Sequence, residues 1–173
     1  MCSPGQILAQ EEPRVPTAGS YGVSFGLPDG GGAGFGLRRM LSSRINAGLD
    51  VVFDVSWQDF DRPVGPQEEP RTSFHLELVP NIRLYKGSEG AIVLPFLLLG
   101  LRGSYTKAPV DGWGVGAGAE VGLGVEWFPA PAVSVSGSTG ARATYGSNSG
   151  QGYSGKFFNL GVFRSELTLN LYF

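Results

Sequence analysis

The sequence predicts an all-β chain in which about eight antiparallel strands run up and down in sequence order and close into a barrel. Apolar and polar residues alternate with a period of two along most of the chain, which is the period of a strand and not of a helix. Glycine is abundant, 28 of 173 residues, whereas in a helix each glycine would cost up to ~1 kcal/mol. No segment of helical length separates the alternating stretches, so sequential strands should pair as antiparallel hairpins.

The alternation is clearest in residues 45–58, INAGLDVVFDVSWQ, where every second residue from Ile45 to Trp57 is apolar. A helical period would scatter these residues around a cylinder. Pro80 falls inside another such stretch and predicts a bulge or local irregularity there. The other predicted strands span residues 20–28, 33–38, 73–85, 91–105, 113–127, 133–145 and 156–173. Residues 91–105 are apolar on both faces, so the alternation does not assign their orientation.

The links between these strands predict on which side the termini lie. Links after the first, third, fifth and seventh strands are longer and rich in Gly, Pro or Asp, whereas the alternate links, such as KGSEG and FPAPA, are short. This asymmetry is typical of outer-membrane barrels, which have short periplasmic turns. Both termini are therefore expected on the periplasmic side.

Two parts of the chain are distinguished by composition. Residues 1–19 are expected to form a flexible N-terminal segment, and the stretch that ends near Ala9 resembles the end of a signal peptide. A short disordered leader is the alternative interpretation. Residues 20–173 are predicted to form the barrel.

Composition also excludes several classes of protein. The formal net charge is −2, which argues against a nucleic-acid partner. One Cys and one His rule out an intramolecular disulfide and a zinc cluster, and we expect no metal and no cofactor. The longest apolar run, residues 91–101, contains Pro95 and Gly100 and is shorter than the ~20 residues of a spanning helix.

The alternation alone does not say which face points inward. A soluble lipocalin-like barrel is apolar inside, whereas a membrane barrel is apolar outside. The polar face here consists mostly of Gly, Ser, Asn and Thr, which is unusual for a surface in water but suits a narrow lumen. Aromatic residues lie near the strand ends of the apolar face, as they do at membrane interfaces. The predicted membrane-interface residues are Tyr21, Trp57, Trp113, Trp127, Tyr145 and Phe173.

The C-terminal stretch LTLNLYF supports the membrane alternative. It places Leu167, Leu169, Leu171 and Phe173 on one apolar face. This ending resembles the C-terminal signature of bacterial outer-membrane barrels, which the barrel-assembly machinery reads, although Ser165 departs from it. Residues 20–173 resemble the small outer-membrane barrels of the OmpA/OmpX type. The resemblance implies an eight-stranded transmembrane barrel in the bacterial outer membrane, surrounded by lipid, monomeric, and partnered by the assembly machinery during biogenesis.

An outward apolar face would leave many charged side chains in the lumen. Because an unpaired buried charge costs several kcal/mol, we expect arginine–carboxylate pairs that fill it. A gated path for protons or small ions is the alternative. Besides Arg38, the predicted network consists of Asp50, Asp54, Glu77, Arg83, Glu120, Glu126, Arg142, Arg164 and Glu166.

His75 raises the question of catalysis. Ser73 and Glu77 lie two residues away on the same face, and some outer-membrane barrels that modify lipid A use a His with a Ser and an acid. The stretch SFHLEL lacks the His-x-Ser pattern of the deacylases in that class, so we assign no catalytic residue. The predicted function is a non-enzymatic structural or surface-interaction role. The alternatives are a narrow pore, a lipid A-modifying enzyme and a soluble lipocalin-like binding barrel.

Overall fold

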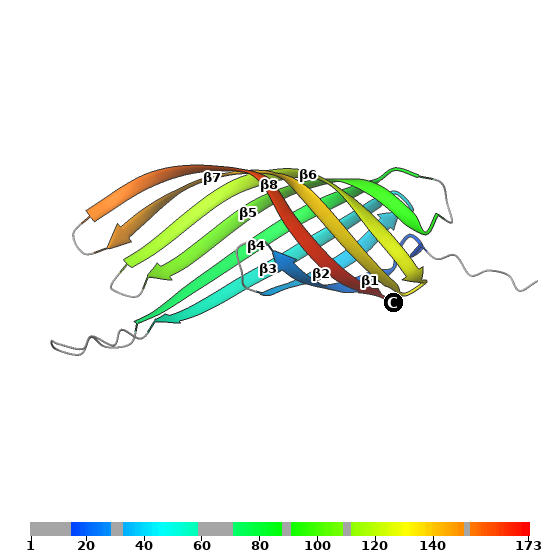
Figure 1. Cartoon of the computed structure of the whole chain (residues 1–173), viewed down its shortest axis with the longest axis horizontal. Coiled ribbons are helices and arrows are strands. Elements are labelled where there is room, and N and C mark those ends of the chain that lie inside the picture. The colour runs from blue at the N-terminus through cyan, green and yellow to red at the C-terminus, as the bar shows by residue number, and fades with distance from the viewer. Residues whose placement is uncertain (1–14, 29–32, 59–70, 88–90, 109–111, 151–152) are drawn as a thin grey trace, which may run out of the picture.

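The computed structural model describes residues 15–28, 33–58, 71–87, 91–108, 112–150 and 153–173. These residues form eight strands that pair in sequence order, all antiparallel, and β8 pairs back with β1 to close the barrel (Figure 1). The strands are β1 Tyr21–Pro28, β2 Ala33–Ser42, β3 Ile45–Gln58, β4 Arg71–Tyr85, β5 Val93–Ala108, β6 Gly112–Ala130, β7 Val133–Gly150 and β8 Tyr153–Tyr172. The predicted fold class is confirmed.

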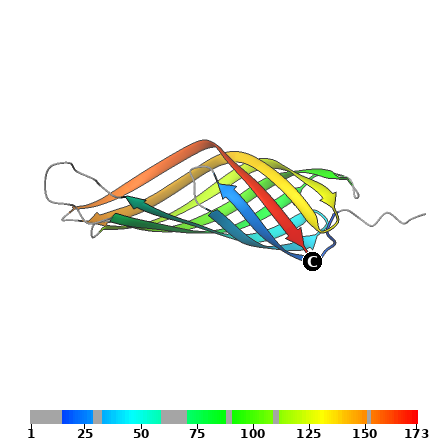
Figure 2. The same cartoon turned by 60° about the horizontal axis from the view of Figure 1, so that its bottom comes forward.

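The first and last strands meet where the chain ends. Tyr21 N–H donates to the Phe173 carbonyl at 3.1 Å, and Phe173 N–H donates to the Tyr21 carbonyl at 2.8 Å. We call this end of the barrel the terminal end and the opposite end, where β3 and β4 are linked, the loop end. The strands run obliquely between the two ends (Figure 2).

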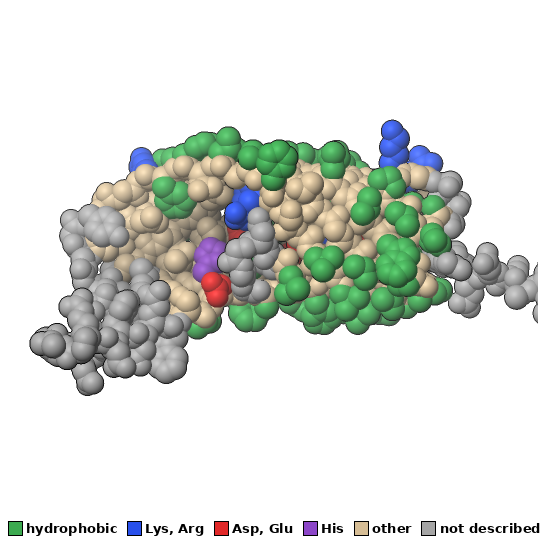
Figure 3. Space-filling view, in the orientation of Figure 1, with side chains coloured by type: hydrophobic (Ala, Val, Ile, Leu, Met, Phe, Trp, Pro, Cys, Tyr) green, Lys and Arg blue, Asp and Glu red, His purple; other side chains and the backbone are tan. Residues whose placement is uncertain are grey.

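The apolar face of the strands points outward. In β6, for example, Trp113, Leu123 and Trp127 are exposed, whereas Glu126 and Phe128 are buried inside the barrel. Among the described residues, thirty-two large hydrophobic side chains are exposed, and on one face hydrophobic side chains gather along the upper edge and at the lower right (Figure 3). This distribution is the reverse of that in a lipocalin-like soluble barrel, so that alternative is wrong.

The structure resolves the orientation of β5. Leu94, Phe96 and Arg102 are buried inside the barrel, whereas Leu99 and Leu101 are exposed outside it. A strand that is apolar on both faces is possible here because the inner Leu94 and Phe96 pack in an apolar cluster at the terminal end.

One bulge interrupts β8. Arg164 pairs with Gly140 and Val162 pairs with Ala141, so Phe163 is an extra residue without a partner on β7. Phe163 has φ 57°, in the left-handed region, and its side chain is 86% exposed. The extra residue reverses the alternation, because a shift of one residue turns every later side chain to the other face.

The predicted asymmetry of the links is met only in part: the longest link, residues 59–70, lies at the loop end as predicted, but other links break the pattern. Several strands are longer than predicted, and β7 and β8 extend through most of residues 146–155, leaving only 151–152 between them. The link 86–92 at the terminal end is longer than the links 109–111 and 151–152 at the loop end. Gly- and Ser-rich segments can still form a backbone ladder, so the prediction from composition wrongly assigned these strand residues to loops.

The irregularity predicted at Pro80 takes a milder form than a bulge. Pro80 pairs with Leu49 of β3 in an unshifted register. On the β5 side the register also stays constant, but the ladder skips from Leu78 to Asn81. A proline has no N–H to donate, so it interrupts the ladder on one side only.

Candidate functional site: a charged lumen in separate clusters

The carboxylate of Glu126 is the centre of the first cluster, which we call the Glu126 cluster. Glu126 is completely buried, and its two oxygens accept from groups on three other strands. The donors are Arg83 and Tyr85 of β4, Ser134 of β7, and Asn170 and Tyr172 of β8. The distances from Arg83, Asn170 and Tyr172 are 3.2, 3.1 and 3.1 Å. Charge-assisted hydrogen bonds of this number offset the desolvation of a buried carboxylate.

An apolar layer closes the barrel below the Glu126 cluster. Met40, Tyr85, Leu94, Phe128 and Tyr172 are buried together at the terminal end, and Phe96 joins them. The Phe128 and Tyr172 rings lie 6.4 Å apart between centroids. Val15, from the segment that leads into β1, packs against this layer. The lumen is therefore filled at this end by both apolar and hydrogen-bonded side chains.

A second cluster joins β2, β3 and β4. Arg38 donates to Asp50 at 2.9 Å and to the Asn81 side-chain oxygen at 2.9 Å. The Asn81 amide donates in turn to Asp50 at 2.6 Å. Each of the three side chains thus contacts the other two, so the buried arginine is paired with a carboxylate and an amide.

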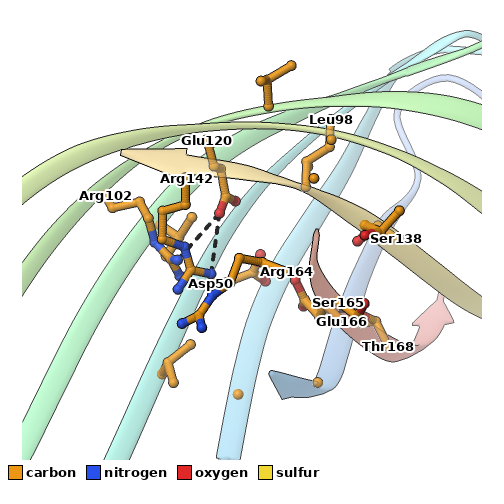
Figure 4. Close-up of a pocket in the computed structure, with 18 of the residues that line it drawn as sticks. Asp50, Leu98, Arg102, Glu120, Ser138, Arg142, Arg164, Ser165, Glu166 and Thr168 are labelled. Atoms are coloured by element: carbon orange, nitrogen blue, oxygen red, sulfur yellow. Dashed lines mark hydrogen bonds and ion pairs between the residues drawn. The ribbon is translucent and has the colours of Figure 1, made fainter. Parts of the chain in front are cut away.

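The third cluster, which we call the Arg102 cluster, lies nearer the loop end. Arg102 of β5 contacts both Glu77 oxygens, with Nη2 donating to Oε2 at 2.8 Å and Nε 2.7 Å from Oε1. Glu120 of β6 lies 3.4 Å from Arg102 Nη1 and 3.6 Å from Arg142 Nη2 (Figure 4). Beside this cluster is a cavity of about 40 Å³. A site for one water needs roughly 10–15 Å³, so this cavity can hold a few water molecules.

The predicted lumen network is thus divided into separate clusters. Arg83 pairs with Glu126, Glu120 with Arg142, and Asp50 with Arg38. Glu77 lies in the Arg102 cluster. Glu166 and Arg164 of β8 line the cavity, and Glu166 accepts a hydrogen bond from Thr168 at 3.1 Å. Asp54 lies outside all three clusters, exposed on β3 and opposite His75 in the ladder.

The sequence prediction missed Arg102, which joins two carboxylates of its cluster. It was missed because residues 91–105 are apolar on both faces at their start. A signal was present further along: Gly100, Arg102, Ser104 and Thr106 are small or polar at every second position. That local alternation would have placed Arg102 in the lumen.

The structure does not form the Ser73–His75–Glu77 arrangement considered for catalysis. His75 Nδ1 lies 2.9 Å from the Thr106 hydroxyl of β5, and Ser73 bonds to the Ser56 hydroxyl. Glu77 is held by Arg102 and is therefore engaged away from His75. Among the described residues, no group of three or more His, Cys, Asp and Glu side chains is placed to hold a metal ion.

The predicted interface aromatics are on the outer surface. Tyr21, Trp127 and Phe173 are exposed toward the terminal end, and Trp113 and Tyr145 toward the loop end. The side chain of Trp57 lies outside the described part of the structure. Leu167, Leu169 and Leu171 also face outward beside Phe173. Their roles at the interface and in assembly stay predictions.

Comparison with known proteins yields structural similarity alone. No protein-family model and no curated protein matches the chain. The N-terminal β-barrel domain of Pseudomonas aeruginosa OprF is 13% identical with a TM-score of 0.48, over 90% of this chain and 98% of that one. Ail, the attachment invasion locus protein of Yersinia pestis, is 13% identical with a TM-score of 0.38, over 88% and 93%.

The described strands of this chain form a closed eight-stranded up-and-down barrel. In the described part of the chain, no helix is long and apolar enough to cross a membrane.

Proposed function

We propose that this chain is an integral outer-membrane barrel with a structural or surface-interaction role and a lumen that is closed by its own side chains. The observation that carries the proposal is the inverted distribution of polarity. Apolar side chains are exposed around the barrel, whereas Arg38, Arg83, Arg102 and Glu126 are buried within it. An exposed apolar surface of this extent is unfavourable in water but matches the lipid-facing band of a membrane barrel.

The closed lumen supports a role for the outer surface and not for transport. The Glu126 cluster and the apolar layer beneath it fill the barrel at the terminal end, and no catalytic residue is assigned. The surface that remains available to partners is the loop end and the lipid-facing wall. We therefore place the activity of this protein in the membrane as a scaffold or contact surface.

Cell fractionation and gel mobility test the membrane placement. We expect the expressed chain to sediment with outer membranes, to resist extraction by alkaline carbonate and to be released by detergent. The folded barrel should migrate differently in a denaturing gel before and after boiling, because the closed strand ladder resists detergent unfolding. A chain that stays in solution without detergent and has one mobility before and after boiling would contradict the proposal.

A further inference from the structure

The charged side chains on the outer face of the described strands are all basic. Successive side chains of a strand point to opposite faces, so each charge can be assigned from its neighbours. The basic residues that alternate in step with exposed apolar residues are Arg39 of β2, Lys107 of β5 and Lys156 of β8. The acidic residues of the described strands alternate in step with the lumen instead: Asp50, Asp54, Glu77, Glu120, Glu126 and Glu166.

Arg39 lies on the outer wall toward the terminal end, between Leu37 and Leu41, which are 55% and 51% exposed. Its guanidinium carbon is 5.2 Å from the centroid of the Tyr21 ring, and Tyr21 is its partner in the β1–β2 ladder. An aromatic ring attracts the positive charge but accepts no conventional hydrogen bond. Among the described residues, no carboxylate pairs with Arg39, so its N–H donors are available at the surface.

Two further basic residues lie at the same end of the barrel. Arg44 is in the turn between β2 and β3, and its carbonyl accepts from the Tyr85 N–H at 2.8 Å. Lys86 follows Tyr85, so Arg44 and Lys86 lie close together, and both are exposed. Basic side chains project from the barrel at this end (Figure 3). Because β2 ends at Ser42, Arg39 is about 10 Å of strand away from the turn, which long side chains can bridge around one head group.

This arrangement matches the head group of an anionic phospholipid. A planar guanidinium binds phosphate oxygens in a bidentate manner, and Arg39 has no described carboxylate that competes for it. The outward Leu37 and Leu41 offer an apolar surface to acyl chains beside the head group. No described acidic side chain pairs with Arg44 or Lys86 either. The surplus of positive charge disfavours the ammonium group of a zwitterionic lipid.

We propose that Arg39 and Arg44 bind the phosphate of an anionic glycerophospholipid in the leaflet at the terminal end, with its acyl chains along the outward leucines of β2. Tyr21 holds the Arg39 guanidinium at that level, where interfacial aromatic side chains are expected. Lys86 adds to the attraction for the negative charge. This inference rests on the membrane placement proposed above and adds to it a preferred lipid class and a place on the barrel.

Quenching by brominated lipids in phosphatidylcholine vesicles tests the site. In a Cys2→Ser background, Leu37→Cys and Val125→Cys each provide one thiol for a fluorescent label. Leu37 is close to Arg39, whereas Val125 lies on β6, and the two side chains are 55% and 52% exposed. Dibromo-phosphatidylglycerol should quench the label at position 37 at about fivefold lower mole fraction than the label at 125, as expected for one basic contact. Dibromo-phosphatidylcholine should quench both labels alike.

Three variants identify the side chains that are responsible. Arg39→Gln should raise the half-quenching mole fraction of phosphatidylglycerol at position 37 to that at position 125, because the amide is polar but carries no charge. Arg44→Gln should change it in the same direction by a smaller factor. Lys107→Gln is the matched control, since Lys107 is an outward, exposed basic residue near the loop end of β5. It should leave the preference for position 37 unchanged.

Each outcome has a defined meaning. Equal quenching of the two labels by phosphatidylglycerol, the same preference with phosphatidylcholine, or a preference that persists in both arginine variants would overturn the head-group site. Arg39 would then only extend toward water. Gel mobility shows first whether each variant is folded, and Arg44→Gln keeps the test available if Arg39→Gln is not. If neither lipid quenches either label, the membrane placement itself fails, whereas equal quenching by both lipids leaves that placement intact.

Discussion

At the scale of single residues, Glu126 accepts hydrogen bonds from every other strand that contributes to the Glu126 cluster. It lies in β6, and its partners come from β4, β7 and β8. A buried carboxylate with this many donors is a point at which the strands are locked in register. Removing it would leave the buried Arg83 without its carboxylate and the hydroxyls of Tyr85 and Tyr172 without the acceptor that they share.

We expect Glu126→Ala to lower the free energy of unfolding by about 3–5 kcal/mol, because breaking a buried ion pair leaves its partner uncompensated. Glu126→Gln should cost less, since the amide oxygen still accepts while the charge on Arg83 stays unpaired. Urea titration in lipid vesicles, followed by gel mobility, measures both effects. Asp54→Asn is the matched control, because Asp54 is exposed. A loss from Asp54→Asn equal to that from Glu126→Ala would contradict this prediction.

At the scale of elements, β8 is divided by its bulge. On the C-terminal side of Phe163, the even-numbered residues Arg164, Glu166 and Thr168 face the lumen. On its N-terminal side the inward positions are odd-numbered, since Gly161 pairs with the inward Arg142. The bulge lies in the part of β8 beyond its ladder with β1, which ends where Pro28 pairs with Glu166. Bulges bend a strand and re-aim its side chains, and this one lets both halves of β8 keep an apolar outer face.

Deleting Phe163 should leave the barrel intact. The deletion makes the β7–β8 register continuous, so that every remaining side chain keeps its face, and it removes a left-handed residue that costs about 1–2 kcal/mol. The loss of an outward aromatic offsets part of that gain, so the free energy of unfolding should change by less than about 1 kcal/mol.

Deleting Leu167 is the contrasting variant for β8. It removes another outward residue but turns Arg164 and Glu166 toward lipid, which costs ~2–4 kcal/mol for an arginine at mid-membrane. Urea unfolding in vesicles compares the two deletions. If both were equally damaging, the bulge would not set the faces of β8 as described.

At the scale of the whole molecule, the lumen contains paired charges and hydrogen-bonded polar side chains. Three clusters of paired charges occupy it at successive levels, and an apolar layer closes the terminal end. The barrel differs from a cylinder in one respect, since its wall is low at the β1–β2 hairpin (Figure 2). The exposed apolar outer surface is therefore the part of the described barrel that is available for interaction.

Single-channel recording in planar bilayers should detect no stepwise conductance over a wide voltage range, because side chains fill the terminal end of the lumen. Phe128→Ala combined with Met40→Ala removes two of the largest buried side chains there, and we expect rare small openings from that variant alone. Insertion of both proteins is checked by gel mobility of the reconstituted vesicles. Regular conductance steps from the unmodified protein would refute the closed lumen.

The sequence by itself determined the fold class and the face of almost every strand, because a period of two is a local property of extended backbone. It also supplied most charges of the lumen, but it missed Arg102 and included Asp54, which is exposed on β3. It could not show which charges meet, since Arg102 and Glu77 lie 25 positions apart and Tyr172 and Glu126 lie 46 apart. Those contacts depend on strand tilt, register and closure, which no local pattern encodes.

Tertiary structure alone decided the remaining features. The neighbouring strand determined how far the Gly- and Ser-rich segments continue as strand. A backbone ladder forms wherever a paired strand is present, even without alternating apolar side chains. Closure against β1 showed that β1 is much shorter than β8 and pairs only with the C-terminal part of it. The orientation of β5 and the bulge at Phe163 were also decided by pairing, because the register with β6 and with β7 determines which side chains point inward.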